Sequence, residues 1–136
     1  LNMVVAQRLA RRLCDHCKKQ AELPEKVMAD IKERATAIPQ KIMDKNIPNF
    51  DINNVKIYEP VGCVRCGHSG YKSRVSLSEI LDVNQHIREV IINKGGQLTV
   101  DEVRKNQPFL TVEQDGLIKV FQGLTSIEEI KRVMQT

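Results

Sequence analysis

The sequence predicts a mainly α-helical chain with a small β element, composed of a four-cysteine knuckle subdomain and a small C-terminal helical subdomain. Three observations lead to this fold class. Two Cys-x-x-Cys pairs, Cys14–Cys17 and Cys63–Cys66, use all four cysteines of the 136-residue chain. Apolar residues recur at helical spacing in several segments bounded by Gly or Pro. Residues 99–136 contain three Thr-x-x-Glu/Gln capping boxes, which are start signals for short helices.

The two cysteine pairs predict a structural zinc site. Two Cys-x-x-Cys turns that face each other can place four thiolates in a tetrahedron, which is the preferred shell of structural zinc. Gly67 follows the last cysteine and suits a tight knuckle, because a residue without Cβ lets backbone N–H groups turn toward sulfur. We therefore expect one zinc ion per chain, held by Cys14, Cys17, Cys63 and Cys66, in a tetracysteine zinc-knuckle subdomain.

Other uses of the cysteines stay open at this point. Two disulfides or a redox site are alternatives, although the hydrophilic composition and the lack of a signal-peptide pattern suggest a reducing compartment. A thioredoxin-like site would need a βαβ pattern, which the sequence lacks. His16 and His68 adjoin ligand cysteines and could replace one, but with four thiols available we expect them to face solvent or to be hydrogen-bonded neighbours.

Residues 1–13 are expected to form an amphipathic helix. Its apolar face would hold Leu1, Val4, Val5, Leu9 and Leu13, and its other face Arg8, Arg11 and Arg12. Because the apolar pattern is already under way at the first residue, without an initiator Met, we expect the N-terminus to be a cut through a larger protein.

The 45 residues between Cys17 and Cys63 exceed the usual ribbon spacing, so this segment must leave the knuckle and return. We expect a helical insertion at about 20–56. Its expected parts are a helix opened by Pro24 and ending before Pro39, a helical turn at 40–47, a polar connection at 48–54 and an extended run at 55–58.

The segment after the second pair is predicted to begin with one strand and continue as helices. Residues 74–83 alternate well enough for the strand, and residues 84–93 follow as a helix that stops at Gly95-Gly96. Capping boxes at Thr99, Thr111 and Thr125 predict three short helices with no catalytic residue, the second ending at Gly123. The predicted segments are thus 1–13, a tetracysteine subdomain at 14–74 and a C-terminal helical subdomain at 75–136.

Composition sets limits on function. The formal charge of +4 falls to about +2 once four thiolates and one Zn²⁺ are counted, which makes no case for nucleic acid. The aromatic share of 4%, with no Trp, argues against a base-stacking surface. No run of 18 apolar residues could span a membrane.

Two alternative functions are weighed against a structural zinc module. A free-standing zinc-ribbon module could bind nucleic acid through the cations Arg8, Arg11, Arg12, Lys18 and Lys19. A metalloenzyme fits poorly, because a four-cysteine shell leaves no open position for water. Cations near the cysteines could offset the charge of the zinc centre or form a solvated basic face, and the sequence favours neither. They are Lys18, Lys19, Arg65 and Lys72.

Several stretches together resemble the assembly ATPases of type II secretion and type IV pilus systems, the GspE/PilB family. They are Val4–Cys14, Gly62–Arg74 with its Gly-Tyr-x-x-Arg ending, Glu79–Leu81, Asp115–Val120 and Gly123–Glu129. The likeness covers both ends and the middle of the chain and fails over residues 20–56, where the family varies in length.

The resemblance implies a role within a larger motor. The whole protein would be a cytoplasmic homo-hexameric ATPase, held at the inner membrane by platform and cytoplasmic adaptor proteins, that drives pilin or pseudopilin polymerisation. Residues 1–13 would then end a helix of the ATPase core. This chain has no Gly-x-x-x-x-Gly-Lys-Ser/Thr loop, so ATP and magnesium would bind before Leu1. We therefore expect this chain to be non-enzymatic, to couple upstream ATP hydrolysis to membrane partners, and to have no nucleic-acid partner.

Overall fold

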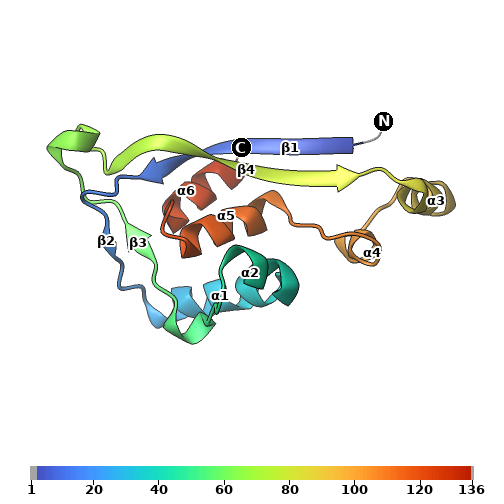
Figure 1. Cartoon of the computed structure of the whole chain (residues 1–136), viewed down its shortest axis with the longest axis horizontal. Coiled ribbons are helices and arrows are strands. Elements are labelled where there is room, and N and C mark those ends of the chain that lie inside the picture. Colours follow the sequence, from blue (N-terminus) through green and yellow to red (C-terminus); the bar gives the residue numbers. More distant parts are fainter. Residues whose placement is uncertain (1–2, 136) are drawn as a thin grey trace.

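The computed structural model describes residues 3–135 as a long antiparallel ribbon with helices packed beneath it (Figure 1). The ribbon consists of β1 (Met3–Leu13) and β4 (Tyr71–Asp82). Helices α5 and α6 lie directly under the ribbon, and α1 and α2 lie below α5. The remaining elements are β2 (Lys19–Gln20), α1 (Glu25–Thr36), α2 (Gln40–Asn46), a 3-10 turn at Ile52–Asn54, β3 (Tyr58–Glu59), a 3-10 turn at Val64–Cys66, α3 (Gln85–Asn93), α4 (Val100–Arg104), α5 (Val112–Phe121) and α6 (Ile127–Met134).

The predicted helix over residues 1–13 is wrong, because this segment is a strand. β1 pairs with β4 from Met3↔Asp82 to Arg11↔Arg74, and a bulge follows between Arg11 and Leu13. The expected apolar face is not a buried stripe: Val4, Val5 and Leu9 are 46%, 53% and 51% exposed, whereas Ala10 is fully buried. Leu1, also assigned to that face, lies outside the described residues. Pairing along most of the strand has overridden an apolar spacing that fits a helix.

The other expected elements lie close to their predicted places. Pro24 and Pro39 precede α1 and α2, and the strand expected at 74–83 is β4. Thr111 and Gln114 form a reciprocal capping box on α5, which ends before Gly123 at φ 78°. The third expected cap is wrong, because Ser126 rather than Thr125 caps α6. In place of capping, the Thr125 hydroxyl donates to the Arg11 carbonyl oxygen at 2.8 Å.

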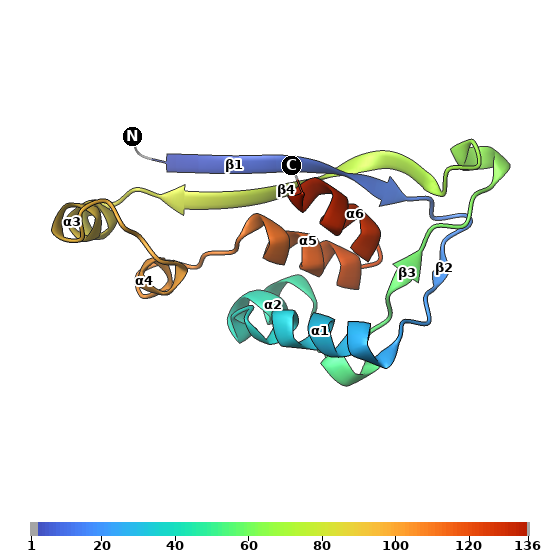
Figure 2. The same cartoon turned by 180° about the vertical axis from the view of Figure 1, so that it is seen from behind.

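Helices and a small antiparallel sheet are both present, but the ribbon is a larger β element than the sequence predicted. The described residues hold two separate two-stranded sheets, β1–β4 and the short β2–β3 pair. Both strands of the ribbon are long, so the β layer spans the molecule (Figure 2). No helix within residues 3–135 is long and apolar enough to cross a membrane.

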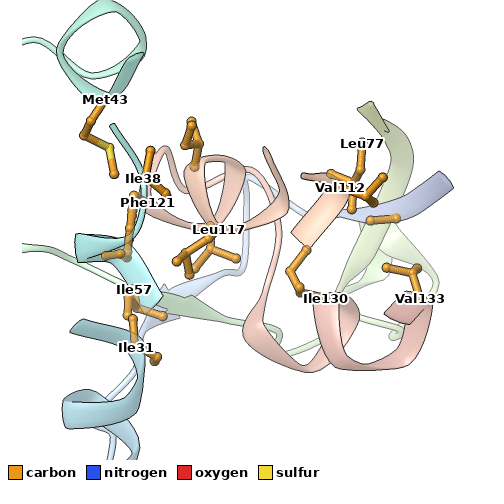
Figure 3. Packing of buried hydrophobic residues seen from close by; sticks show 14 residues of the cluster. Ile31, Ile38, Met43, Ile57, Leu77, Val112, Leu117, Phe121, Ile130 and Val133 are labelled. Carbon is orange, nitrogen blue, oxygen red and sulfur yellow. The ribbon is translucent and has the colours of Figure 1, made fainter. Parts of the chain in front are cut away.

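One main core joins the insertion to the C-terminal helices (Figure 3). Ile31 and Ile38 of the insertion, and Ile57 directly after it, pack in the same cluster as Leu117 and Phe121 of α5. The cluster continues to Leu77 on the ribbon and to Ile130 and Val133 on α6. A second, smaller cluster joins α3 and α4 through Ile87, Val103 and Phe109. The main core therefore draws on all three predicted segments, and the boundaries between those segments stay a prediction.

Glu129 on α6 fixes the helical layer to the edge of β1. Its side chain is 1% exposed, and one carboxylate oxygen accepts the Arg11 backbone N–H at 2.8 Å. The Arg11 side chain donates to the carboxylate at 2.9 Å, and Arg132 donates through two nitrogens at 2.8 and 2.9 Å. Burial opposes ionisation of Glu129, but the hydrogen bonds from Arg132 and Arg11 outweigh it and lower its pKa to about 2.

We predict that Glu129→Gln lowers the free energy of unfolding by about 2 kcal/mol at neutral pH, because it weakens several charge-assisted hydrogen bonds at once. The pKa of Glu129 is depressed from 4.5 to about 2 in the folded state. Its contribution is therefore complete above the unfolded-state pKa and lost as pH falls from about 4.5 to about 2. Urea unfolding of both proteins across this range gives the measurement. The difference between them should shrink toward acid pH, while metal loss at low pH affects both alike. A difference independent of pH would contradict the assignment.

Candidate metal centre

The four cysteines lie together at one end of the ribbon, opposite the end that carries α3 and α4 (Figure 2). β1 ends at Leu13, so Cys14 is the first residue after the strand, and it is buried. In the second pair, Cys63 caps the 3-10 turn Val64–Cys66 and Cys66 ends it, shortly before β4 begins at Tyr71. The antiparallel ladder thus brings the two knuckles to the same place.

The sulfur separations fit one tetrahedral zinc ion. All four sulfurs lie within 4.8 Å of one another. The Cys63–Cys66, Cys14–Cys63 and Cys17–Cys66 separations are 3.7, 3.8 and 3.9 Å. Zinc–sulfur bonds of about 2.3 Å in a regular tetrahedron require sulfurs about 3.8 Å apart. A disulfide would need about 2.05 Å, so these sulfurs are not bonded to one another. The arrangement could hold a metal ion and is consistent with zinc; zinc ligation itself stays a prediction.

Backbone N–H groups point at the sulfurs, as a thiolate centre requires. Cys66 Sγ accepts from the N–H groups of Cys63 and Gly70, each at 3.2 Å, and Cys17 Sγ accepts from Gly62 at 3.3 Å. Within the described residues, the hydrogen bonds to sulfur come from backbone N–H groups and from the other thiols. Oriented peptide dipoles therefore compensate part of the charge on the sulfurs.

Two glycines that the sequence analysis did not single out for this role make these bonds possible. Gly62 has φ 113°, and a Cβ there would lie 2.7 Å from the His68 carbonyl oxygen. Gly70 has φ 84°, and a Cβ there would lie 2.4 Å from Cβ of Pro60. Gly67, which was expected to suit the tight knuckle, has φ 66°, and its own N–H donates to the Val64 carbonyl oxygen. The sequence feature that could have indicated this role is the presence of glycine on both sides of the second cysteine pair.

The metal-free thiols differ in acidity. Burial opposes ionisation of Cys66, but the N–H groups of Cys63 and Gly70 lower its pKa to about 6. The N–H of Gly62 favours the thiolate of Cys17, but burial and the neighbouring thiols outweigh it and raise its pKa to about 11. Zinc requires thiolates, so binding would displace the remaining protons and would weaken in acid.

Both histidines are neighbours rather than parts of the cluster. His16 is exposed, and its Nε2 accepts from Arg65 at 2.8 Å. His68 is also exposed, with φ 65°, and its backbone N–H donates to the Cys63 carbonyl oxygen at 2.8 Å. The four sulfurs complete a tetrahedral shell without either imidazole.

The cations that could have contacted nucleic acid have partners within the chain. Arg8 donates to the Val133 carbonyl oxygen at 2.8 Å, and Arg11 pairs with Glu129. Asp15 lies 3.6 Å from Arg12 and 3.1 Å from Lys18, and Glu59 lies 3.3 Å from Lys19. Each of the five cations thus has a partner within the described chain, and the expectation that nucleic acid is not a partner stays a prediction.

The turn between α5 and α6 docks against the strand and knuckle that carry the first cysteine pair. Leu13 N–H donates to the Leu124 carbonyl oxygen at 2.8 Å, and Lys18 Nζ donates to the Gly123 carbonyl oxygen at 2.9 Å. The Tyr71 hydroxyl lies 2.8 Å from Ser126 Oγ. These contacts connect the cysteine cluster to the C-terminal helices through short polar bonds.

Comparison with known proteins identifies the family. Residues 1–132 match the family described as Type II/IV secretion system protein. The chain belongs to this family. It is 34% identical to the type IV pilus assembly ATPase PilB of Pseudomonas aeruginosa over 133 residues, which is 98% of this chain and 21% of that protein. The corresponding protein of Acinetobacter baylyi is 36% identical over 98% of this chain and 21% of its own length.

A type II secretion system ATPase, protein E of Vibrio cholerae, is 32% identical over 96% of this chain and 22% of its own length. The chain therefore spans about a fifth of the length of these relatives. The resemblance noted from the sequence is confirmed, and the matched range includes residues 20–56, where the likeness was not recognised.

We predict that the purified chain contains one zinc ion and that its four thiols become reactive only after chelation. Metal analysis after exhaustive dialysis and thiol titration before and after chelation provide the measurement. Four thiols that react freely in the native, metal-free protein would contradict the assignment.

We predict that Cys63→Ser loosens the cysteine end of the molecule and spares the opposite end. Faster amide exchange is expected in residues 14–20 and 57–72, which the metal would hold together, and in the docked turn Gly123–Ser126. Helices α3 and α4 should be unaffected because they share their own cluster. Val64→Ala is the matched control, since Val64 lies between the two cysteines but is 84% exposed. Equal loosening of α3 and α4 would show that the sulfur cluster controls the whole fold.

Proposed function

We propose that this chain is the zinc-binding, non-catalytic part of an ATPase that powers type IV pilus or type II secretion pseudopilus polymerisation. The observation that carries the proposal is four sulfurs at zinc-tetrahedron spacing in a chain that matches this family along nearly all its length. The relatives' names supply the ATPase activity and the two kinds of machine.

The chain's own residues support a structural rather than a chemical role. A shell of four thiolates leaves no open position where a metal-bound water could act. The sequence has no Gly-x-x-x-x-Gly-Lys-Ser/Thr loop to hold nucleotide phosphates. In this proposal ATP and magnesium bind in the rest of the protein, and zinc supplies a cross-link between the two knuckles.

The ribbon is the element through which movement would reach the metal centre. The sequence suggested a continuous helix into the first knuckle, but the connection is β1, which is paired with β4 over most of its length. The centre closes this ribbon at one end, and the α5–α6 turn is bonded to it there. A displacement at the other end would therefore be carried to the C-terminal helices and not lost by strand separation.

We further propose the location, oligomeric state and partners of the whole protein that the family suggests. The whole protein would work as a cytoplasmic homo-hexamer at the inner membrane. It would contact a platform protein in the membrane and a cytoplasmic adaptor. The surface that this chain offers to those partners would move with the ribbon and the metal centre.

The test is a chimera in which this chain replaces the 133 matched residues of the Pseudomonas aeruginosa relative. We expect the chimera to restore pilus assembly, and we expect Cys63→Ser to abolish assembly while ATP turnover continues. The isolated chain should show no ATP turnover, because it lacks a phosphate cradle and a metal-bridging acid.

The Val64→Ala chimera is the control and should assemble pili as the unsubstituted chimera does. Assembly that survives Cys63→Ser would disprove the role of the metal centre in coupling. ATP turnover by the pure chain, abolished by a substitution within it, would disprove the non-catalytic assignment.

A further inference from the structure

An arginine-lined hollow of about 490 Å³ opens beside the ribbon, and no cysteine lines it. Its lining consists of Leu9, Ala10, Arg11, Arg74 and Arg132. Arg11 and Arg74 are cross-strand partners in the β1–β4 ladder, and Arg132 comes from α6. Residues far apart in the sequence thus bring three guanidinium groups to one depression.

Two of the three guanidinium groups are held in place before any ligand arrives. Arg11 lies over the Tyr71 ring, with its guanidinium carbon 4.3 Å from the ring centroid, and it donates to Glu129. Arg132 is fixed by its two hydrogen bonds to the same carboxylate. Both arginine side chains nevertheless stay about half exposed, at 48% and 54%, so their remaining N–H groups face the hollow or solvent.

The charge in the hollow is not balanced by the protein. Within residues 3–135, Glu129 is the one carboxylate bonded to these arginines, and its two oxygens already accept four N–H donors from Arg11 and Arg132. Across residues 3–135, the Arg74 side chain has no hydrogen bond or ion pair. Glu128 is exposed on α6 and close enough to raise the pKa of Tyr71, but it forms no ion pair within the described chain.

Like charges directly opposite on paired strands destabilise a sheet. Arg11 and Arg74 occupy such positions, and among the described residues no acid other than Glu129 forms an ion pair with either. Three guanidinium groups and one saturated carboxylate leave a charge of about +2. An anionic ligand bound here would reduce the repulsion between these like charges.

We propose that Arg11, Arg74 and Arg132 form a binding site for a phosphate dianion, either free or as a terminal monoester. A phosphate of this kind carries about −1.5 to −2 charges at neutral pH, which matches the residual charge, whereas one carboxylate carries −1. The planar fork of a guanidinium group pairs with two phosphate oxygens at once, so three forks can share the tetrahedral group. The proposal is independent of the zinc site and of the motor function.

The test follows the Nε–Hε signals of the arginine side chains in the full, zinc-loaded chain by NMR. Inorganic phosphate and glycerol 3-phosphate are the probes, titrated separately with chloride adjusted to hold ionic strength constant. We expect saturable shifts of the Arg11, Arg74 and Arg132 signals. Acetate at equal ionic strength should bind more weakly. A stronger response to glycerol 3-phosphate would identify the monoester, and an equal response the phosphate group alone.

Arg74→Gln is the decisive variant, because the Arg74 side chain is exposed and forms no hydrogen bond or ion pair with the described part of the chain that folding would lose. We expect it to weaken phosphate binding about tenfold, the loss of roughly one charge-assisted hydrogen bond. Arg88→Gln, which removes the same charge from exposed Arg88 on α3, should change binding less than about twofold. Equal weakening by both variants, or equal shifts with acetate and phosphate, would overturn the proposal and show only general attraction of anions.

Discussion

A long excursion that must leave and rejoin one end of the ribbon is the constraint on which the rest of the structure depends. β1 ends at Leu13 and β4 begins at Tyr71, so the chain between them departs and returns at a single point. The four sulfurs lie at this point. Beyond them the departing and returning segments pair again as β2 and β3, and together these parts form a stem. A cross-link across a loop of this length removes about 3 to 5 kcal/mol of chain entropy from the unfolded state. Structural zinc binds cysteine-rich peptides with about 10 to 16 kcal/mol, so one ion is ample to close the stem.

The remainder of the excursion is held by packing rather than by the stem. Helices α1 and α2 fold back beneath α5, where Ile31, Ile38 and Met43 join the core with Leu117. The insertion therefore serves as a third layer that covers the far side of α5. A long gap between the cysteine pairs is therefore compatible with a compact metal centre. A metal ion on the four sulfurs would hold the two ends of the gap together, and apolar burial holds its middle.

The sequence was most informative where local chemistry decides the outcome. Two Cys-x-x-Cys pairs, prolines before helices and the Thr111 capping box each act within a few residues, and the structure places them as expected. It was least informative where a distant partner decides. β1 is a strand because β4 lies beside it, and nothing local to residues 3–13 reveals that partner. In the sequence Thr125 resembles a helix cap and Glu129 a surface residue. In the structure both side chains form hydrogen bonds with the Arg11 backbone. The glycines that direct N–H groups to sulfur could have been suspected only from their positions around the second pair.

A ribbon of two strands transmits force only if its register is fixed, and several features fix it here. Isolated two-stranded ribbons are marginally stable, and a slip of one residue would move every side chain to the opposite face. Such a slip would expose Ala10 and Leu77, which are fully buried, and would carry the Arg11 side chain toward the apolar helical layer. Glu129 and Thr125 also bind the Arg11 backbone at the outer edge of β1, so the strand cannot slide without breaking both bonds. A metal ion held by the four sulfurs would then prevent separation at the end of the ladder. With α6 bound along the edge and a metal ion closing the end, the ribbon, the metal centre and the C-terminal helices would move as one unit.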